Sequence, residues 1–448
     1  MRGEERLIGE NVATIHQGID LLDGLDPEVY ARGGRFEARS SVGGHIRHCI
    51  DFYTAFLDGA TMGRIDYTAR ARDPRVERDV RCAHDRLVDV AVRFTLLPDD
   101  VTRATVMVRA EEGDPAAAPI QRFDPSALPV RFACEVGDDF APDKYLGFKE
   151  VRRTDRVAQM GTTAALDAFH AAGDLAVDPA RAAVVVGTGI GGLATQEAEE
   201  RVLFEQGPGR VSPLLVPMMM PNATAAQVAL QLGWTGPTLC IATACAAGTH
   251  AVGEGARLVR DGSADVVLAG GAEAVITPVA MAAFARMGAL STRNDDPAAA
   301  SRPFDAARDG FVMGEGAAFL VLEEWDRAIA RGARVLGEVL GYGATTDAHH
   351  ITAPAPGGAG AAACVEVALA DAGVAAGAVG HVNAHGTSTP LNDEAEAAAL
   401  GKVFGPGAVP VTASKGVLGH LIGAAGAAEA VLTVLALGDG TVPPVANH

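Results

Sequence analysis

The chain has 448 residues, a formal net charge of −19 and a hydrophobic content of 48%. At roughly 150 residues per domain, this length allows two or more domains with real cores. The acidic balance argues against a broad surface for nucleic acid or anionic membrane, so an acidic partner would need a local basic patch. Aromatic residues make up 5% of the chain, and 53 glycines indicate close packing and many tight turns.

The N-terminal region, residues 1–112, differs from the rest and is long enough to be a domain of its own. It is rich in Arg, Asp and His, and residues 43–59 have the periodicity of a helix. Residues 86–110 alternate Val and Thr, which predicts strands. Residues 113–122 have the composition of a linker. We therefore expect a mainly helical region joined by a linker to a second domain.

Residues 123–448 repeat the order strand, Gly-rich loop, helix. The runs AAVVVGTG, ADVVLAGGAE and AAFLVLEE fit buried strands of an α/β fold. Residues 237–266 and 409–443 share one layout, in which a strand leads through a tight loop into a helix of small residues. This likeness predicts two related halves, with Cys245 and His420 at corresponding junctions between loop and helix.

The cysteines and the apolar segments predict a cytoplasmic protein. The six cysteines are scattered without a CxxC pair, which is typical of reduced thiols. The first ten residues hold no apolar stretch that could act as a signal peptide. The most apolar run, residues 421–438, is mostly Ala and Gly and carries Glu429, so we expect a buried helix and no membrane span.

Cys245 is the first candidate for chemistry. In CIATACAAGTH (240–250) it follows an apolar strand and opens a helix among small residues. Such a turn exposes a side chain at a helix N-terminus, where the dipole and free N–H groups favour the reactive thiolate. A free cysteine is by default a small buried hydrophobe, and Cys240, in mid-strand, fits that interpretation. Local context leaves both interpretations of Cys245 open.

Two histidines lie in similar positions. VNAHGTSTP (382–390) ends a strand with His385, and SKGVLGH (414–420) supplies Lys415 and His420. Alpha/beta proteins place functional groups at the ends of strands, although a lone histidine is more often structural. One Cys and two His that converge from such loops would form a nucleophile with acid–base partners.

Two other motifs are interpreted as structural. GTGIGG (187–192) matches a dinucleotide-binding pattern, but no strand with an acidic residue follows about 20 residues later, so these glycines are expected to form tight turns. In DAHHIT (347–352) the adjacent histidines of an extended segment point to opposite faces. A metal site is therefore not expected there.

From about Phe123 to the C-terminus the chain resembles the β-ketoacyl-acyl carrier protein synthases, specifically the type II elongating enzymes of fatty acid synthesis. The motifs that carry the resemblance are CIATACAAG, VVLAGGAEA, ALSTRNDDPAAASRPFDAARDGFVMGEGAAFLVLEE, VNAHGTSTP and SKGVLGHLIGAAGAAE. Aromatic polyketide ketosynthases share several of them and are an alternative. The resemblance implies a homodimer with a thiolase-like fold, in which two related βαβαβαββ halves are layered α-β-α-β-α.

The resemblance also implies residue roles. Cys245 would carry the acyl chain. His385 and His420 would drive decarboxylation of malonyl-carrier protein and stabilise the enolate that forms. Lys415, paired with Glu429, would keep the histidines in order.

Binding residues follow from the same resemblance. Thr387 and Thr389 match threonines that hydrogen-bond the phosphopantetheine arm. The partner would be an acyl carrier protein, docked on the basic patch Lys149, Arg152 and Arg153. No cofactor is expected, because phosphopantetheine arrives on the carrier protein.

The chain departs from the family at both ends. The family's first strand and its C-terminal GFGG segment have no counterpart, so the resemblance implies an incomplete fold. Loss of the oxyanion donor in that segment would cost on the order of 10² to 10³ in rate. A non-catalytic synthase-like chain is therefore an alternative from another class.

Residues 1–112 resemble part of a DinB-like four-helix domain. His45 or His48 would be the first metal ligand of that family, and its second group of histidines has no counterpart here. Since a lone ligand seldom holds a metal, no metal is expected.

Overall fold

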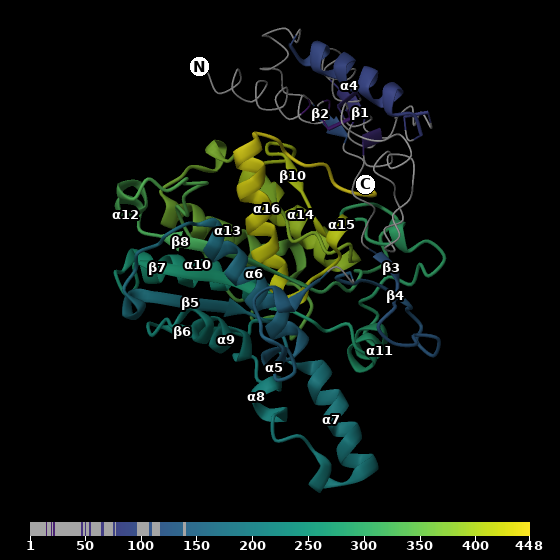
Figure 1. Ribbon diagram of the computed structural model, residues 1–448, viewed down its shortest axis with the longest axis vertical. Coiled ribbons are helices and arrows are strands. Elements are labelled where there is room, and N and C mark those ends of the chain that lie inside the picture. Colours follow the sequence, from purple (N-terminus) through teal and green to yellow (C-terminus); the bar gives the residue numbers. More distant parts are fainter. Residues whose placement is uncertain are drawn as a thin grey trace. The chain divides into compact units, whose positions relative to one another are not determined.

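The computed structural model divides into two compact units, Met1–Glu112 and Gly113–His448 (Figure 1). In the second unit it describes residues 117–137 and 140–448. In the first unit it describes single residues and the short stretches 21–22, 46–47, 53–54, 64–66, 75–76, 78–95 and 107–109.

The first unit contains helix α4 (Val80–Thr95) and two short parallel strands, β1 (Arg64–Asp66) and β2 (Met107–Arg109). The strand prediction for residues 86–110 is therefore wrong as far as Thr95. The apolar side chains of α4 recur at helical spacing. This spacing decides for a helix, although Val and Thr residues favour strands. Those that reach the core of the unit from α4 are Ala83, Leu87 and Val90.

Most of residues 43–59 lie outside the described residues, and those that are described are helical. His45 and His48, the residues of the DinB-like prediction, also lie outside the described residues.

A four-stranded sheet forms the centre of the second unit, in the order β6-β5-β7-β8. Its strands are β5 (Ala182–Gly187), β6 (Thr238–Ile241), β7 (Val266–Glu273) and β8 (Gly316–Glu323). Strand β5 runs parallel to β6 and β7, whereas β8 runs antiparallel to β7. Strands β5 and β7 are buried along their whole length, as their Val- and Ala-rich sequences predict for strands covered on both faces.

Helices cover both faces of this sheet. Helices α6 (Arg156–Ala171) and α9 (Ala223–Leu232) pack on one face. Helices α10 (Ala247–Arg260) and α16 (Ala425–Asp439) pack against each other on the opposite face. Alternate side chains of β5 point to the two faces, as the strand period of two requires.

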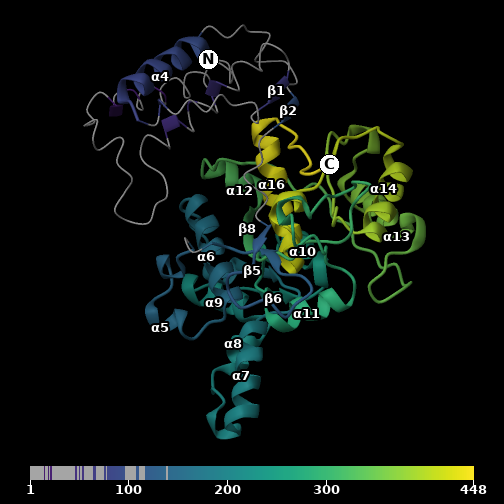
Figure 2. The ribbon, with the colours of Figure 1, turned by 90° about the vertical axis from the view of Figure 1, so that its right-hand side faces the viewer.

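A second, smaller sheet lies beyond α10 and α16. It pairs β9 (Val382–Asn383) in parallel with β10 (Val411–Thr412). The Asn383 side chain donates to the Glu429 carbonyl oxygen at 3.0 Å and so ties β9 to α16. Figure 2 shows the succession α6 and α9, large sheet, α10 and α16, and finally α13 (Ala359–Ala372) and α14 (Pro390–Phe404). With the small sheet as the fourth layer, this is the predicted α-β-α-β-α layering.

The second half is less regular than a βαβαβαββ repeat predicts, because residues 333–355 contain no helix or strand. Two strands of two residues each make a weak ladder on their own, so neighbouring helices must hold them in place. The outer helices of this half are α13 (Ala359–Ala372) and α14 (Pro390–Phe404).

The remaining elements complete the unit. Helix α7 (Leu193–Gln206) projects away from the rest of this unit in both ribbon views. The remaining elements are the antiparallel pair β3 (Ala117–Pro119) and β4 (Phe132–Cys134), and helices α5 (Phe148–Val151), α7 (Leu193–Gln206), α8 (Leu215–Met219), α11 (Pro278–Arg286), α12 (Trp325–Ala330) and α15 (Lys415–Leu418).

The glycines of GTGIGG serve close packing. A Cβ atom on Gly187, at the end of β5, would lie 2.3 Å from the carbonyl carbon and oxygen of Ala247, the first residue of α10. Gly191 has a φ of +91°, a conformation that glycine adopts at no steric cost. Glycine at position 187 therefore lets the N-terminus of α10 lie directly against the strand end.

In the described part of the chain, Ile422–Asp439 is one stretch long and apolar enough to cross a membrane. Its beginning, Ile422–Ala428, is buried in the domain, and Glu429 follows and forms an ion pair with Lys415. Leu435 and Leu437 are exposed, so the predicted burial holds for the first part of the helix and not for its end.

Candidate active site

Cys245 lies in a single 3-10 turn, Ala244–Ala246, between β6 and α10. Ala244 has a φ of +51°, in the left-handed region that non-glycine residues seldom adopt. This sharp reversal sets Cys245 immediately before the first residue of α10. The turn thus has the form that its small residues predict.

Cys245, His385 and His420 converge from three loops, which follow β6, β9 and the short helix α15 after β10. The Nε2 atom of His420 lies 3.0 Å from the Cys245 Sγ. The two imidazole rings are nearly perpendicular, with centroids 5.4 Å apart. One nitrogen of each ring and the sulfur all lie within 4.8 Å of one another. The three side chains are therefore close enough to act on one small group.

Two donors fix the tautomers of the histidines. The backbone N–H of Ile422 donates to His420 Nδ1 at 3.2 Å. The Lys415 ammonium, which can only donate, lies 3.3 Å from His385 Nδ1. Each neutral ring must therefore carry its proton on Nε2. His420 therefore presents its N–H donor to the sulfur at 3.0 Å, and one ring nitrogen of His385 lies within 4.8 Å of the same sulfur.

Burial and charge keep both rings neutral. Burial, followed by the nearby Lys415 charge, lowers the pKa values of His385 and His420 well below 6.5. Lys415 itself is 2% exposed and pairs with Glu429. Burial also raises the pKa of Glu429, whereas Lys415 opposes that rise.

The two cysteines of the motif differ in their surroundings. Burial raises the pKa of Cys245, and the Lys415 charge opposes the rise. Cys240 lies in the edge strand β6, where burial, followed by the Glu273 charge, raises its pKa to about 11. Only Cys245 therefore combines a helix start, a lysine charge and a histidine N–H that could stabilise a thiolate.

Cys245, His385 and His420 are also the one group of potential metal ligands among the described residues of this unit. Metal binding through Nε2 would require the ring proton to move to Nδ1. There it would face the Ile422 N–H or the Lys415 ammonium, which are both donors. The donor set thus suits an oxygen that accepts hydrogen bonds better than it suits a cation.

The remaining predicted residues fall into two places. Thr387 and Thr389 lie in the loop after His385, with their hydroxyl oxygens 2.8 Å apart. The three basic residues are exposed on or just after α5, beside Phe148, whose side chain is 76% exposed. They are Lys149, Arg152 and Arg153.

Two carboxylates that the sequence analysis did not single out support the site, the half-buried Glu396 and the fully buried Glu273. Glu396 accepts the backbone N–H groups of His385 at 2.6 Å and Gly386 at 2.7 Å. Glu273 accepts the N–H of Gly423, three residues after His420, at 3.0 Å. Glu273 belongs to the quoted motif VVLAGGAEA, and Glu396 lies six residues after VNAHGTSTP. A carboxylate in an apolar context was the available signal.

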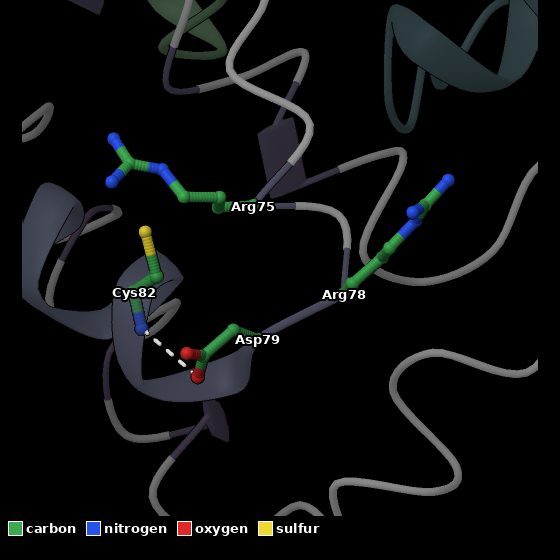
Figure 3. A pocket seen from close by; sticks show the side chains of 4 residues that line it. All are labelled: Arg75, Arg78, Asp79 and Cys82. Atoms are coloured by element: carbon green, nitrogen blue, oxygen red, sulfur yellow. Dashed lines mark hydrogen bonds between the residues drawn. The ribbon is translucent and has the colours of Figure 1, made fainter.

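A cavity in the first unit has no comparable convergence. Its lining includes Arg75, Arg78, Asp79 and Cys82 (Figure 3). Figure 3 shows the guanidinium groups of Arg75 and Arg78 directed apart. The Asp79 carboxylate accepts the Cys82 N–H at 3.3 Å, which caps the start of α4. The DAHHIT motif is likewise structural, since His350 Nδ1 accepts the N–H groups of Thr352 and Ala353.

Comparison with known proteins decides the family. Residues 98–328 match the N-terminal domain and residues 336–448 the C-terminal domain of beta-ketoacyl synthases. The chain belongs to the β-ketoacyl synthase family. It is 46% identical over 341 residues to 3-oxoacyl-[acyl-carrier-protein] synthase 2 of Synechocystis sp., covering 75% of this chain and 82% of that protein. The corresponding Vibrio cholerae protein is 44% identical, with coverage of 73% and 80%.

Solved structures of β-ketoacyl synthases agree with the fold. The ishigamide ketosynthase/chain length factor aligns with a TM-score of 0.70 at 37% identity, covering 75% of this chain and 82% of that one. A beta-ketoacyl synthase from Burkholderia phymatum aligns with a TM-score of 0.66 at 34% identity, covering 72% and 79%. The chain is thus a thiolase-like, acyl-transferring condensing enzyme, a β-ketoacyl synthase of fatty acid elongation.

The buried histidines predict a pH dependence of stability. The pKa values of these histidines in the folded chain lie below the unfolded value of about 6.5. Above that pH the rings are neutral in both states, so protonation does not oppose folding. As the pH falls, the unfolded chain binds protons that the folded site excludes. Each histidine then removes up to about 1.4 kcal/mol per pH unit. We expect the free energy of unfolding, measured by urea titration, to fall below pH 6.5 more steeply than in the double variant His385→Asn/His420→Asn. Equal slopes would contradict this.

Proposed function

We propose that Cys245 forms the acyl thioester of the condensing reaction. Its thiolate attacks the carbonyl carbon of an acyl thioester, and the carrier thiol leaves with a proton. The attack forms one C–S bond and breaks another. The start of α10, the Lys415 charge and the His420 Nε2–H all favour the anionic sulfur.

We propose that the two histidines then act on the malonyl thioester. Decarboxylation breaks the bond to the carboxylate, releases CO₂ and leaves the electron pair as an enolate. Two neutral Nε2–H groups, preorganised by fixed tautomers, can donate to that enolate oxygen. This pair of donors is the observation that carries the proposal.

The enolate carbon next attacks the acyl group on Cys245. A C–C bond forms, the C–S bond breaks, and the sulfur leaves as the thiolate with which the cycle began. Lys415 keeps His385 in the donor tautomer, and Thr387 and Thr389 are placed to bind the phosphopantetheine arm in the loop after His385.

Intact mass after incubation with an acyl-loaded carrier protein tests the nucleophile. The wild-type chain is expected to gain one acyl group, and Cys245→Ala none. Cys240→Ala is the matched control and is expected to keep the adduct, because its thiol lies on the edge strand. An adduct on Cys245→Ala, or none on a wild-type chain that unfolds cooperatively, would refute the assignment.

We propose that α5 binds the acyl carrier protein. Lys149, Arg152 and Arg153 are exposed there on a chain of net charge −19, and the exposed Phe148 ring packs against the Arg152 guanidinium with 5.6 Å from its carbon to the ring centroid. A solved relative, AntDE:AntF, is a ketosynthase in complex with its acyl-carrier protein, which supports this partner. Basic residues around an apolar contact suit an acidic surface.

Arg152→Glu is expected to weaken carrier binding by at least tenfold, since like charges would face each other. Binding is measured by isothermal titration with acyl-carrier protein at low salt. The control is Arg201→Glu on α7, which is expected to leave the affinity unchanged. Equal affinities for the wild type and Arg152→Glu would contradict this docking surface.

We propose that the chain forms a homodimer through the free edge of β6. This strand ends the sheet and would leave its outer N–H and C=O groups unpaired. Apolar side chains are also exposed on β6 and on or next to helices α8 and α9, which precede it in the chain. They are Val216, Met220, Leu230 and Leu239. A second copy would cover both features.

Leu239→Asp is expected to shift the sedimentation coefficient from dimer to monomer, because it puts a charge into the contact. Val367→Asp, on an exposed position of α13, is the control and should sediment as the wild type does. A monomeric wild-type chain at micromolar concentration would overturn the dimer. The cytoplasmic location suggested by the scattered thiols stays a prediction.

A further inference from the structure

Glu273 is a fully buried carboxylate at the end of β7. Its Oε2 atom accepts the backbone N–H groups of Gly189 at 2.5 Å and Gly423 at 3.0 Å. Its Oε1 atom accepts the Thr188 hydroxyl at 3.0 Å and the Ile190 N–H at 3.4 Å. One side chain thus satisfies four donors from two separate loops.

The two loops touch at their backbones. A Cβ atom on Gly423 would lie 2.2 Å from the nitrogen of Gly189, so the two loops pack closer than other residues permit. Ile422 has a φ of +44°, a conformation that costs free energy in a β-branched residue. The Glu273 bond to the next N–H, that of Gly423, helps to hold this turn.

The same turn sets the tautomer of His420. Its Ile422 N–H is the group that donates to His420 Nδ1. A rotation of the Ile422–Gly423 backbone would withdraw that donor, and the His420 proton could then move to Nδ1. Nε2 would become an acceptor and could no longer donate a hydrogen bond to an enolate oxygen.

We propose that Glu273 is a positioning residue for His420: by fixing the Ile422–Gly423 backbone, it keeps the Nε2–H of His420 directed at the reacting oxygen. The inference rests on the proposed role of His420 in decarboxylation. It assigns Glu273 no contact with the substrate.

The electrostatics point away from a role in activating the thiol. Burial raises the pKa of Glu273, and the hydrogen bonds from the Gly189, Gly423 and Thr188 groups oppose that rise. Its charge raises the pKa of Cys245, as does that of Glu429, whereas Lys415 lowers it. A carboxylate that disfavours the thiolate contributes to the site through the backbone it holds.

The test compares two half-reactions in the full-length chain. Acyl transfer to Cys245 is followed by intact mass, and decarboxylation by CO₂ release from a malonyl-loaded carrier protein. Glu273→Ala removes the bridge between the loops. Glu273→Gln keeps this bridge, because the amide oxygen can accept the Gly189 and Gly423 N–H groups while the amide NH₂ donates to the Thr188 hydroxyl. It loses only the long contact from the Ile190 N–H, at 3.4 Å.

We expect Glu273→Ala to slow decarboxylation on the order of 10²-fold, the cost of a misplaced catalytic group, and to slow acyl transfer far less. Glu273→Gln should restore most of the decarboxylation. Long-range ¹H–¹⁵N spectra should show His420 protonated at Nε2 in the wild type and Gln variant, and a mixture of tautomers in the Ala variant.

Glu323→Gln is the control for a general loss of stability. Glu323 lies in β8, at the end of the β7–β8 ladder opposite to Glu273. Its side chain is buried and pairs with Arg331 at 2.7 Å. We expect a lower melting temperature with an unchanged ratio of the two rates. If Glu273→Ala lacks a cooperative transition, Glu273→Asp replaces it, because the shorter side chain cannot span both loops.

An unchanged ratio in Glu273→Ala or its Asp replacement would overturn the proposal. A Gln variant as slow as the Ala variant would also do so, since it would mean that the charge acts and the geometry does not. A wild-type chain that forms no acyl adduct or releases no CO₂ would instead refute the proposed function, which keeps the two failures distinct.

Discussion

The buried ammonium of Lys415 is the interaction on which the rest of the site depends. It is 2% exposed, paired with Glu429 and adjacent to His385 Nδ1. Its charge adds to the burial that lowers the pKa values of both histidines, opposes the burial that disfavours a Cys245 thiolate, and fixes one of the two tautomers. Removing one partner of such a pair costs about 3–5 kcal/mol, because the other charge stays buried and unpaired.

The layered fold brings the ends of this network together. Helices α10 and α16 pack side by side on one face of the large sheet. Cys245 lies in the turn before α10, and His420 lies just before the turn that leads into α16. Small residues make this possible. Gly187 lets α10 start against β5, and Gly423 lets the loop after His420 lie on the loop after β5. Larger residues would separate Cys245 from His420.

Hydrogen bonds to the loop backbones then orient the side chains that the fold has brought together. Glu396 holds the N–H of His385, and Glu273 holds the N–H that follows Ile422. Each carboxylate accepts mainly backbone donors, so it orders a loop without touching the reacting atoms. The site therefore rests on two levels, three converging side chains and the carboxylates that fix their loops.

Several features could be predicted from local sequence. The Val- and Ala-rich runs became β5, β7 and β8, because side-chain period and flanking glycines act over a few residues. The strand prediction for residues 86–95 was wrong, because the packing of Leu87 and Val90 into a core favoured the helix. The second half is also less regular than predicted, since residues 333–355 form neither helix nor strand.

The sequence by itself determined the family, the buried strands and the sharp small-residue turn at Cys245, because motifs and short-range periodicity encode them. Only the tertiary structure decided which nitrogen of each histidine carries the proton. That choice depends on donors far away in the chain, such as Lys415 for His385, or on a loop held by a distant carboxylate, as Glu273 holds the turn after His420. Sequence spacing carries no record of such directions, since they arise when separate strands and helices pack.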